Sequence, residues 1–439
     1  MLKKYDKYKD SGIQWLDKIP QDWDIKKIKY CCNIYTGNSI SDDEKDNYTR
    51  AENSIPYVAT KDIDTNVINY DNGLYIPKEN NDFRIAPKNS ILLCIEGGSA
   101  GRKIGYTNQD VCFVNKLCCF KTNDLSNSKY LYYVLQSDMF LTDFNLKMTG
   151  LIGGVSQSAI KSITIASPKL EEQQAIADYL DEKCGEIDNA VETEKNVIEK
   201  LKEYKQSVIT ETVTKGLDKS VELKNSGIKW IGKIPKHWQR TKLKRILEIP
   251  ITDGPHETPI LFDEGIPFIS AEAIKDNKIN FKLMRGYISL EEHLRFCKKY
   301  KPKKNDIFMI KSGATTGNVA IVDTDKEFSI WSPLAVMRAN KNRIYYKYLF
   351  YYIQSYNFKQ QVEQFWSYGT QQNIGMEVLG NLYVAYSCNI QEQQQIADYL
   401  DKKCSQIDET IKKKEELIEK LTEYKKSLIY ECVTGKRKI

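Results

Sequence analysis

The sequence predicts an α+β protein made of two tandem mixed α/β domains and two long helices, related by a pseudo-twofold. Three observations lead to this fold class. A stretch rich in Gly, Ile and Trp at 11–23 returns at 226–238, and Gln-Gln-x-Ile-Ala-Asp-Tyr-Leu-Asp at 173–181 returns at 393–401. An apolar seam with heptad spacing then follows each copy of the second stretch. Repeats so far apart are too long for a solenoid, so the repeated unit is a whole domain followed by a helix.

Each repeat opens with an irregular lead-in that starts Ser-Gly-Ile-x-Trp and ends Ile-Pro-x-x-Trp. A mixed segment of about 150 residues follows, in which short runs of Ile, Val, Tyr and Phe are bounded by Asn, Asp and Gly, a pattern typical of strands. The apolar runs 91–95 and 307–310 predict buried strands. The tyrosine-rich runs 130–135 and 345–353 are longer and follow polar turns, so we expect helices there.

Each repeat closes with a predicted long helix whose seam residues step by four and three positions. A single seam of this kind is also typical of a surface amphipathic helix, but two matched seams favour packing of the helices against each other. Antiparallel packing would bring the two chain ends close together, like a ring that has been cut once. The expected helix-pairing residues are Leu180, Cys184, Ile187, Val191, Ile198, Leu201, Leu400, Cys404, Ile407, Ile411, Ile418 and Leu421.

The charge is distributed unevenly along the repeats. The chain has 65 basic and 59 acidic residues, a net charge of +6. The segment 223–390 has a net charge of +10, whereas 1–170 has +2, 171–222 has −7 and 391–439 has +1. The strongly basic second segment suggests a polyanionic partner.

Composition and motifs argue against several classes of protein. The 11 cysteines form no Cys-x-x-Cys and only three histidines are present, so we expect reduced apolar thiols and no metal site. The lack of a long apolar run and of a signal peptide predicts a cytoplasmic protein without a membrane span. A P-loop, adjacent prolines and a glycine fingerprint for a methyl donor are also missing from the sequence. These features favour a binding protein over an enzyme.

Glycine-rich polar turns occur at comparable places in both repeats. The turn 97–103 corresponds to 313–319, and each comes directly after a predicted buried strand. The segment 154–158 is matched with 369–373. Glycine allows close approach of the backbone to a ligand, and the Gln, Asn, Ser, Thr, Arg and Lys side chains can contact bases and phosphates. A single segment of this composition is more often just a turn, but the occurrence of matched segments in both repeats strengthens the case for DNA contact.

Together these motifs resemble the specificity subunit of type I restriction-modification systems over essentially the whole chain. The strongest marks are the two lead-ins and the two copies of Glu-Gln-Gln-x-Ile-Ala-Asp-Tyr-Leu-Asp. A further mark, Asp-Gly-Pro-His-Glu-Thr-Pro at 253–259, occurs only in the second half. The first half has Thr36, Gly37, Asn38 and Ser39 at that place, with no counterpart of His256.

The resemblance implies target-recognition domains at 1–170 and 223–390, joined by the helical segments 171–222 and 391–439 as an antiparallel coiled coil. Each domain would recognise one half of a bipartite, asymmetric double-stranded DNA site. The implied partners are two modification subunits, which carry S-adenosylmethionine and methylate adenine N6, and added restriction subunits. The chain itself would hold no cofactor and perform no catalysis. Two alternatives are a self-contained methyltransferase or nuclease fusion and a coiled-coil scaffold that binds proteins.

Candidate DNA-binding residues come from the matched turns, the second-half motif and a lysine-rich run at 298–304. That run is consistent with either a solvated loop or a row of phosphate contacts. The candidates are Asn38, Ser39, Lys61, Ser99, Arg102, Lys103 and Gln157 in the first half, and His256, Thr258, Lys298, Lys299, Lys311, Thr315, Thr316, Gln371, Gln372 and Asn373 in the second.

Overall fold

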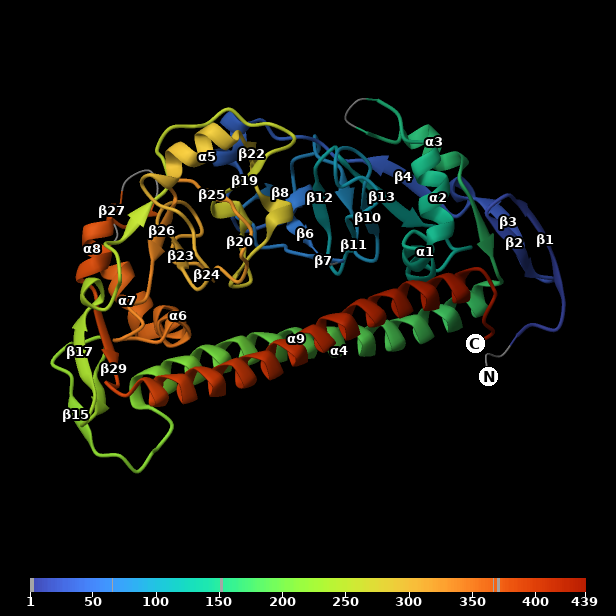
Figure 1. Ribbon diagram of the computed structural model, residues 1–439. Helices are drawn as coiled ribbons and strands as arrows, with labels where there is room; N and C mark the ends of the chain where they lie inside the picture. Colours follow the sequence, from blue (N-terminus) through green and yellow to red (C-terminus); the bar gives the residue numbers. More distant parts are fainter. Residues whose placement is uncertain (1–3, 65, 151–152, 366, 369–371) are drawn as a thin grey trace. The chain divides into compact units, whose positions relative to one another are not determined.

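The computed structural model describes residues 4–64, 66–150, 153–365, 367–368 and 372–439, which fall into two compact units (Figure 1). The first unit contains 1–195 and 415–439, and the second contains 196–414. Each unit therefore holds one mixed α/β domain, the first half of the helix that follows it, and the second half of the other long helix. The second unit is continuous in sequence, whereas the first is assembled from two separate stretches.

A four-stranded sheet with the order β11-β10-β13-β4 forms the centre of the first domain. Its central strand β10 is a fully buried apolar run, as expected for 91–95. The bounds in this sheet are β4 Cys32–Thr36, β10 Ile91–Cys94, β11 Ile104–Tyr106 and β13 Leu117–Thr122. A second sheet, β8-β5-β12-β9, contains the parallel pair β5 and β12, with bounds β5 Ser54–Val58, β8 Tyr75–Pro77, β9 Ile85–Ala86 and β12 Val111–Phe113.

Short strand pairs and helices complete the first domain. The strand pairs are β1 Tyr8–Ile13 with β2 Leu16–Pro20, β3 Asp24–Lys27 with β14 Thr164–Ser167, and β6 Ile63–Asp64 with β7 Val67–Ile68. The helices are α1 Ser128–Val134, α2 Asp138–Leu146, α3 Gln157–Ser162 and the long α4 Leu170–Lys215. A helix over the tyrosine-rich run 130–135 is thus confirmed. Asn127, Ser137 and Ser156 cap α1, α2 and α3 by accepting hydrogen bonds from backbone N–H groups.

The second domain repeats this topology with β18-β26-β23-β24 as its central sheet. Its bounds are β18 Thr252–Asp253, β23 Ile307–Ile310, β24 Val319–Ile321 and β26 Leu334–Met337. A second sheet, β22-β19-β25, again contains a parallel pair, formed by β19 and β25, with bounds β19 Ile266–Ile269, β22 Gly286–Ile288 and β25 Ser329–Ile330. The predicted buried strand 307–310 is confirmed as β23, which is entirely buried.

The remaining elements of the second domain also have counterparts, apart from one helix. The strand pairs are β15 Leu223–Asn225 with β16 Lys233–Pro235, β17 Gln239–Lys242 with β29 Tyr383–Tyr386, β20 Ile274–Lys275 with β21 Lys278–Ile279, and β27 Ser367–Tyr368 with β28 Gln372–Asn373. The helices are α5 Leu290–Cys297, α6 Tyr346–Gln354, α7 Tyr356–Gln364, α8 Met376–Asn381 and the long α9 Ile390–Val433. The helix α5 lies between β22 and β23, where the first domain has only the short strand β9 between β8 and β10.

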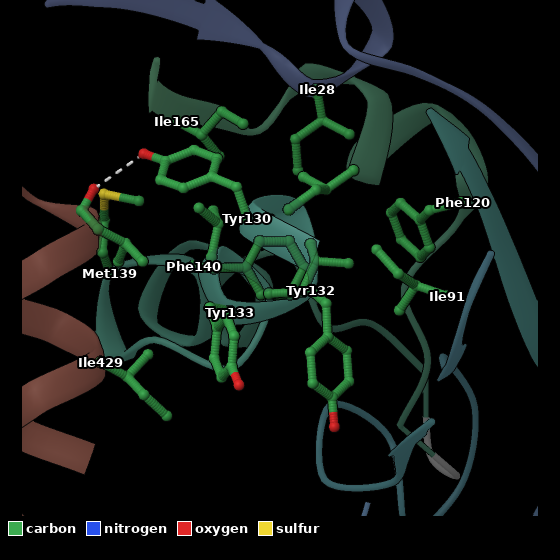
Figure 2. Packing of buried hydrophobic residues seen from close by; sticks show 14 of the residues in the cluster. Ile28, Ile91, Phe120, Tyr130, Tyr132, Tyr133, Met139, Phe140, Ile165 and Ile429 are labelled. Atoms are coloured by element: carbon green, nitrogen blue, oxygen red, sulfur yellow. Dashed lines mark hydrogen bonds between the residues drawn. The ribbon is translucent and has the colours of Figure 1, made fainter. Parts of the chain in front are cut away.

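The tyrosines of α1 lie at the centre of the first unit's core (Figure 2). Figure 2 shows Tyr130 and Tyr133 gathered with Phe140 of α2 and Ile429 of α9. The buried Tyr130 hydroxyl donates to the carbonyl oxygens of Ala166, at 3.0 Å, and Val433, at 3.3 Å. Tyr348 of α6 makes the equivalent bonds in the second unit, to Ala385 at 2.8 Å and Val213 at 2.9 Å. Each domain is therefore attached to the end of a long helix by a buried tyrosine.

The two repeated sequence motifs contact each other within each unit. In the first unit, the indole of Trp23 donates to the Glu172 carboxylate over 3.1 Å. In the second unit, Trp238 donates to Glu392 over 2.9 Å, and His237 lies 3.0 Å from the same carboxylate. Burial raises the pKa of Glu392, but the hydrogen bonds that its carboxylate makes with Ser387, Trp238 and His237 outweigh burial and hold that pKa below its ordinary value. The contact explains why the lead-in and the helix opening recur together.

Antiparallel pairing of α4 and α9 is confirmed separately in each unit. In the first unit, Lys425 of α9 binds Asp188 of α4 at 2.6 Å. In the second unit, Lys205 of α4 binds Asp408 of α9 at the same distance. Asp188 and Asp408 are 220 residues apart, as are Lys205 and Lys425, so the two ion pairs are the same contact made twice. All twelve predicted helix-pairing residues are buried or half-buried.

The chain ends meet within the first unit, as the sequence predicted. The Tyr8 hydroxyl donates to the carbonyl oxygen of Gly435 at 3.2 Å, and the Lys438 ammonium lies 5.7 Å from the ring centre of Tyr5. Gly435 has a φ of +73° and follows the last turn of α9, where glycine commonly ends a helix. The close approach of Gly435 to Pro20 leaves no room for a side chain.

Candidate nucleic-acid interface

The turn after β10 in the first domain is joined to a second polar segment by backbone hydrogen bonds. Val155 donates to the carbonyl oxygen of Ile95 over 2.9 Å, and Glu96 forms a bridge with Gly154. On this turn Arg102 is exposed, Ser99 is half-buried, and the Lys103 ammonium donates to the carbonyl oxygen of Thr60 over 3.0 Å. The structure therefore brings together the 97–103 and 154–158 segments that the sequence singled out, and Lys61 is exposed beside Thr60.

A hydrogen-bonded network of Thr36, Asn38, Gln157 and Arg84 occupies the end of β4, next to this turn. Gln157 at the start of α3 donates its amide to the Thr36 hydroxyl at 3.0 Å. Asn38 accepts from the backbone of Arg84 at 3.0 Å, and Arg84 donates to the Thr36 carbonyl at 3.2 Å. Gln157 and Asn38 thus hold this surface in place through their own hydrogen bonds, while Ser39 is exposed beside them.

The corresponding turn of the second domain is built in the same way. Ile374 donates to the carbonyl oxygen of Lys311 over 2.9 Å, and Ser312 forms a bridge with Asn373. On the turn that follows β23, Thr315 is exposed and the Thr316 hydroxyl donates to the Gly313 carbonyl oxygen over 2.7 Å. The match of 97–103 with 313–319 is consistent with these contacts.

The structure changes the residues of the second domain that correspond to the segment 154–158 of the first. The bridges equate Gly154 with Asn373, not with Gly369 as the sequence suggested. Most of the difference arises earlier in the chain: the turns 97–103 and 313–319 are 216 positions apart, whereas Ser137 and Ser355, the caps of α2 and α7, are already 218 apart. The Thr149–Gly154 bridge then occupies the place of the Ser367–Asn373 pair. Gln157 consequently corresponds to Met376, since each is the first residue of its helix, α3 or α8. Gln372 lies in β28 opposite Tyr368, whereas Gln371 is outside the described residues.

The second domain has a buried carboxylate at the place where the first domain has Thr36. Asp253 has no exposed surface, and its Oδ1 accepts from the Lys299 ammonium over 2.5 Å. Its Oδ2 faces the Lys311 ammonium at 3.3 Å and Nε2 of His256 at 3.1 Å. Burial would favour the neutral acid, but the ammonium groups of Lys299 and Lys311 outweigh burial and hold the pKa of Asp253 below its ordinary value. The three basic residues were predicted from the sequence as candidate DNA-binding residues. The acid that joins them, Asp253, was not predicted, although it lies within the 253–259 motif.

The lysine-rich run after α5 is not a uniform row of unpaired charges. Lys301 pairs with Glu327 at 2.6 Å and Lys304 with Asp325 at 3.2 Å. The Tyr300 ring is buried, and its hydroxyl donates to Asp306. Lys298 remains exposed, as does Thr258 in the 253–259 motif. Phosphate contact by this run stays a prediction, with Lys298 and Lys299 as its best-placed members.

The described residues show neither a metal-binding cluster nor a membrane-spanning helix. Within the described ranges, no group of three or more His, Cys, Asp and Glu side chains is placed to hold a metal ion. The described part of the chain also contains no helix that is both long and apolar enough to cross a membrane.

Known proteins are similar to this chain over nearly its whole length. A family model described as the type I restriction modification DNA specificity domain matches residues 20–203 and again 235–420. The type I restriction enzyme MjaVIII specificity subunit of Methanocaldococcus jannaschii is 25% identical over 444 residues, covering 98% of this chain and 97% of that protein. The EcoBI specificity subunit of Escherichia coli is 27% identical over 234 residues, covering 51% of this chain and 46% of that one.

Solved structures show the same fold. A chain from a study of complex assembly and conformational transition of the type I R-M system has a TM-score of 0.72 at 14% identity, covering 95% of this chain and 99% of that chain. The crystal structure of the HsdS subunit from Thermoanaerobacter tengcongensis has a TM-score of 0.50 at 16% identity, covering 95% and 98%.

The chain contains two copies of one α/β domain with polar turns, and both copies use the same pair of long helices. This arrangement defines the class of duplicated DNA-recognition proteins. The family model covers both copies, and the chain belongs to the type I restriction modification DNA specificity family. It is therefore a specificity subunit, the non-catalytic recognition component of a type I system, which binds DNA and partner subunits.

Proposed function

We propose that each domain recognises one half of a bipartite, asymmetric DNA site. The observation that carries this proposal is that the same surface is built twice with different side chains. Thr36 and Asp253 occupy the same place in the two domains, and beside them the first domain has Asn38 and Gln157 whereas the second has His256 and Lys311. Because base recognition depends on donors and acceptors, different side chains predict different half-sites.

The long helices act as the spacer in this proposal. At about 1.5 Å per residue, a 46-residue α4 is about 69 Å long, and α9 with 44 residues is about 66 Å. Half-sites one turn of B-DNA apart are separated by about 34 Å. Helices of this length are sufficient to carry two domains that bind the same face of a duplex.

The partners in the proposed complex are two modification subunits, with restriction subunits added for cleavage. S-adenosylmethionine would be held by the modification subunits, which methylate adenine N6, and no cofactor by this chain. The exposed carboxylates of α4, among them Asp178, Glu186 and Glu192, offer an acidic surface for docking a modification subunit. The proposed role places the protein in the cytoplasm, with the DNA.

A methylation map of host DNA tests the proposal directly. Single-molecule sequencing would compare cells with and without the gene. We expect N6-methyladenine to disappear from one split, asymmetric motif, since no other chain would direct the modification subunits there. Co-purification with a modification subunit, together with an unchanged map, would instead indicate a silent system. An unchanged map without co-purification would contradict the proposal.

A further inference from the structure

We propose that Asp253 is a positioning residue for DNA binding by the second domain, holding Lys299 and His256 as a phosphate-binding cluster. This inference rests on the proposed function and adds a division of labour between the two domains. The second domain would bind its half-site with cations held by a buried acid, whereas the first would use the hydrogen-bonded network of Thr36, Asn38, Gln157 and Arg84.

The exposure of the side chains around Asp253 distinguishes the residues that hold the cluster in place from the residues that can contact DNA. The carboxylate is fully buried and the Lys311 side chain is only 13% exposed, so this inner pair is nearly closed to solvent. His256 and Lys299 reach the surface, with 70% and 49% of their side chains exposed. One carboxylate faces two ammonium groups, which leaves a surplus positive charge at the exposed end. A surplus cation held by a rigid, buried acid is suited to a phosphate, because its position is fixed before DNA arrives.

A cavity of about 200 Å³ lies between α5 and the 253–257 loop, beside this cluster. Lys299 and Arg295, one turn apart at the end of α5, both line it. Asp253 holds Lys299, and Glu257 holds Arg295 at 2.6 Å. The two acids of the 253–259 motif therefore fix two cations around one cavity, which is large enough for a phosphate group.

The buried acid and its two lysines are particular to the second domain. Thr36 pairs with Cys118 on β13 as Asp253 pairs with Ala335 on β26, so Thr36 occupies the place of Asp253. Ile95, which belongs to the apolar core, occupies the place of Lys311. The described residues between β8 and β10 form no helix in the place of α5, and a cation from this segment, Arg84, donates to the carbonyl oxygen of Thr36 at 3.2 Å. The first domain therefore holds a cation at this place through a backbone carbonyl group and without a buried acid.

The backbone beside Asp253 explains how the carboxylate is held. A Cβ at Gly254 would lie 2.0 Å from the carbonyl oxygen of Ile330, so only glycine fits there. Gly37 has the same restriction against Phe113 in the first domain, at 1.7 Å. The chain path is thus common to both domains, and the side chain before the glycine is what differs.

The test compares Asp253→Asn with Asp306→Asn in the complex reconstituted with its modification subunit. Asp306 serves as the control because it is also a buried carboxylate of the second domain, but it is paired with Arg338 at 2.7 Å and with the Tyr300 hydroxyl, and not with Lys299, Lys311 or His256. Fluorescence anisotropy would measure affinity for a cognate duplex and for duplexes with either half-site scrambled, over a range of KCl concentrations. Thermal unfolding would report the stability of each variant.

We expect Asp253→Asn to weaken binding to the cognate duplex and to both scrambled duplexes by a similar factor, about tenfold, because a phosphate contact carries no base information. The ratio of cognate to scrambled affinity should therefore stay near that of the wild type. Asp306→Asn should keep the wild-type affinity for all three duplexes. Wild-type affinity in both variants would overturn the inference and leave Asp253 a purely structural acid.

A second variant keeps the inference testable where Asp253→Asn does not fold. Lys299→Gln removes a half-exposed cation and leaves Asp253 paired with Lys311. Loss of one phosphate contact should reduce the slope of log affinity against log salt by about one. An unchanged slope would place Lys299 outside the DNA contact and overturn the inference. A wild-type complex that discriminates neither half-site would instead refute the proposed function itself.

Discussion

Two glutamines show how a repeated residue can be required for folding and not for recognition. Gln173 is buried at the start of α4, where its amide accepts from the backbone of Asn127 at 2.9 Å and donates to Pro168 at 2.9 Å. Gln393 repeats this at the start of α9, accepting from Tyr345 at 2.7 Å and donating to Ser387 at 2.8 Å. In each unit one amide fastens the first helix turn to two loops of the domain.

We therefore expect Gln393→Ala to destabilise the protein by about 1–3 kcal/mol, because it leaves buried backbone groups without partners. Gln394→Ala is the matched control, since Gln394 is the exposed neighbour on the same helix turn. Urea unfolding of both variants would measure the difference. Equal stability of the two variants would contradict the assigned role of Gln393.

At the scale of the element, the seam of the long helices is not uniform. Its outer residues, such as Leu180 and Leu400, are fully buried, because the tyrosine-rich helices α1 and α6 lie beside them. Residues nearer the middle of each helix, such as Val191 and Ile411, are only half-buried. Two paired helices without a third neighbour leave part of their seam exposed, so the outer positions should dominate stability.

Leu400→Ala should accordingly destabilise the protein by about 2–5 kcal/mol, through lost apolar burial and the cavity left behind. Leu417→Ala on the same helix is the control, because 41% of that side chain is exposed, and it should change stability by less than about 1 kcal/mol. Denaturant unfolding followed by circular dichroism would compare them. A larger loss for Leu417→Ala would mean that the assigned seam is wrong.

At the scale of the whole molecule, the two units differ in how the chain builds them. The second unit is one continuous stretch, 196–414, whereas the first needs 415–439 to complete 1–195. Leu428, Ile429, Cys432 and Val433 of α9 all belong to the core of the first unit. A fragment lacking them would expose that core to water.

We expect the fragment 196–414 to fold alone with a cooperative thermal transition. The fragment 1–195 should aggregate or remain partly folded, and a peptide of residues 415–439 supplied in trans should restore its transition. Calorimetry of the two fragments, with and without the peptide, would check this. Cooperative folding of 1–195 without the peptide would show that the α9 residues are dispensable.

Sequence patterns predicted the buried strands, the tyrosine helices and the helix seam because each depends on local apolar periodicity. The alignment of Gly154 with Gly369 was wrong, because the second repeat gains residues before this point, where Ser137 and Ser355, the caps of α2 and α7, are already 218 positions apart. Asp253 was missed because nothing in one sequence distinguishes a buried acid from an exposed one. Its three basic partners come from positions 256, 299 and 311, which only the fold brings together.

The sequence by itself determined the duplication, the fold class, the helix pairing and the family, since these are carried by residue order and spacing. Only the tertiary structure decided that the Trp and Glu-Gln motifs contact each other and that each unit contains part of both long helices. The tertiary structure also decided that the second domain has a buried acid paired with lysines where the first has a hydrogen-bonded network around Thr36. The physical reason is that burial and charge pairing depend on distances between residues far apart in the chain. Those distances are set by the packing of the strands and helices together.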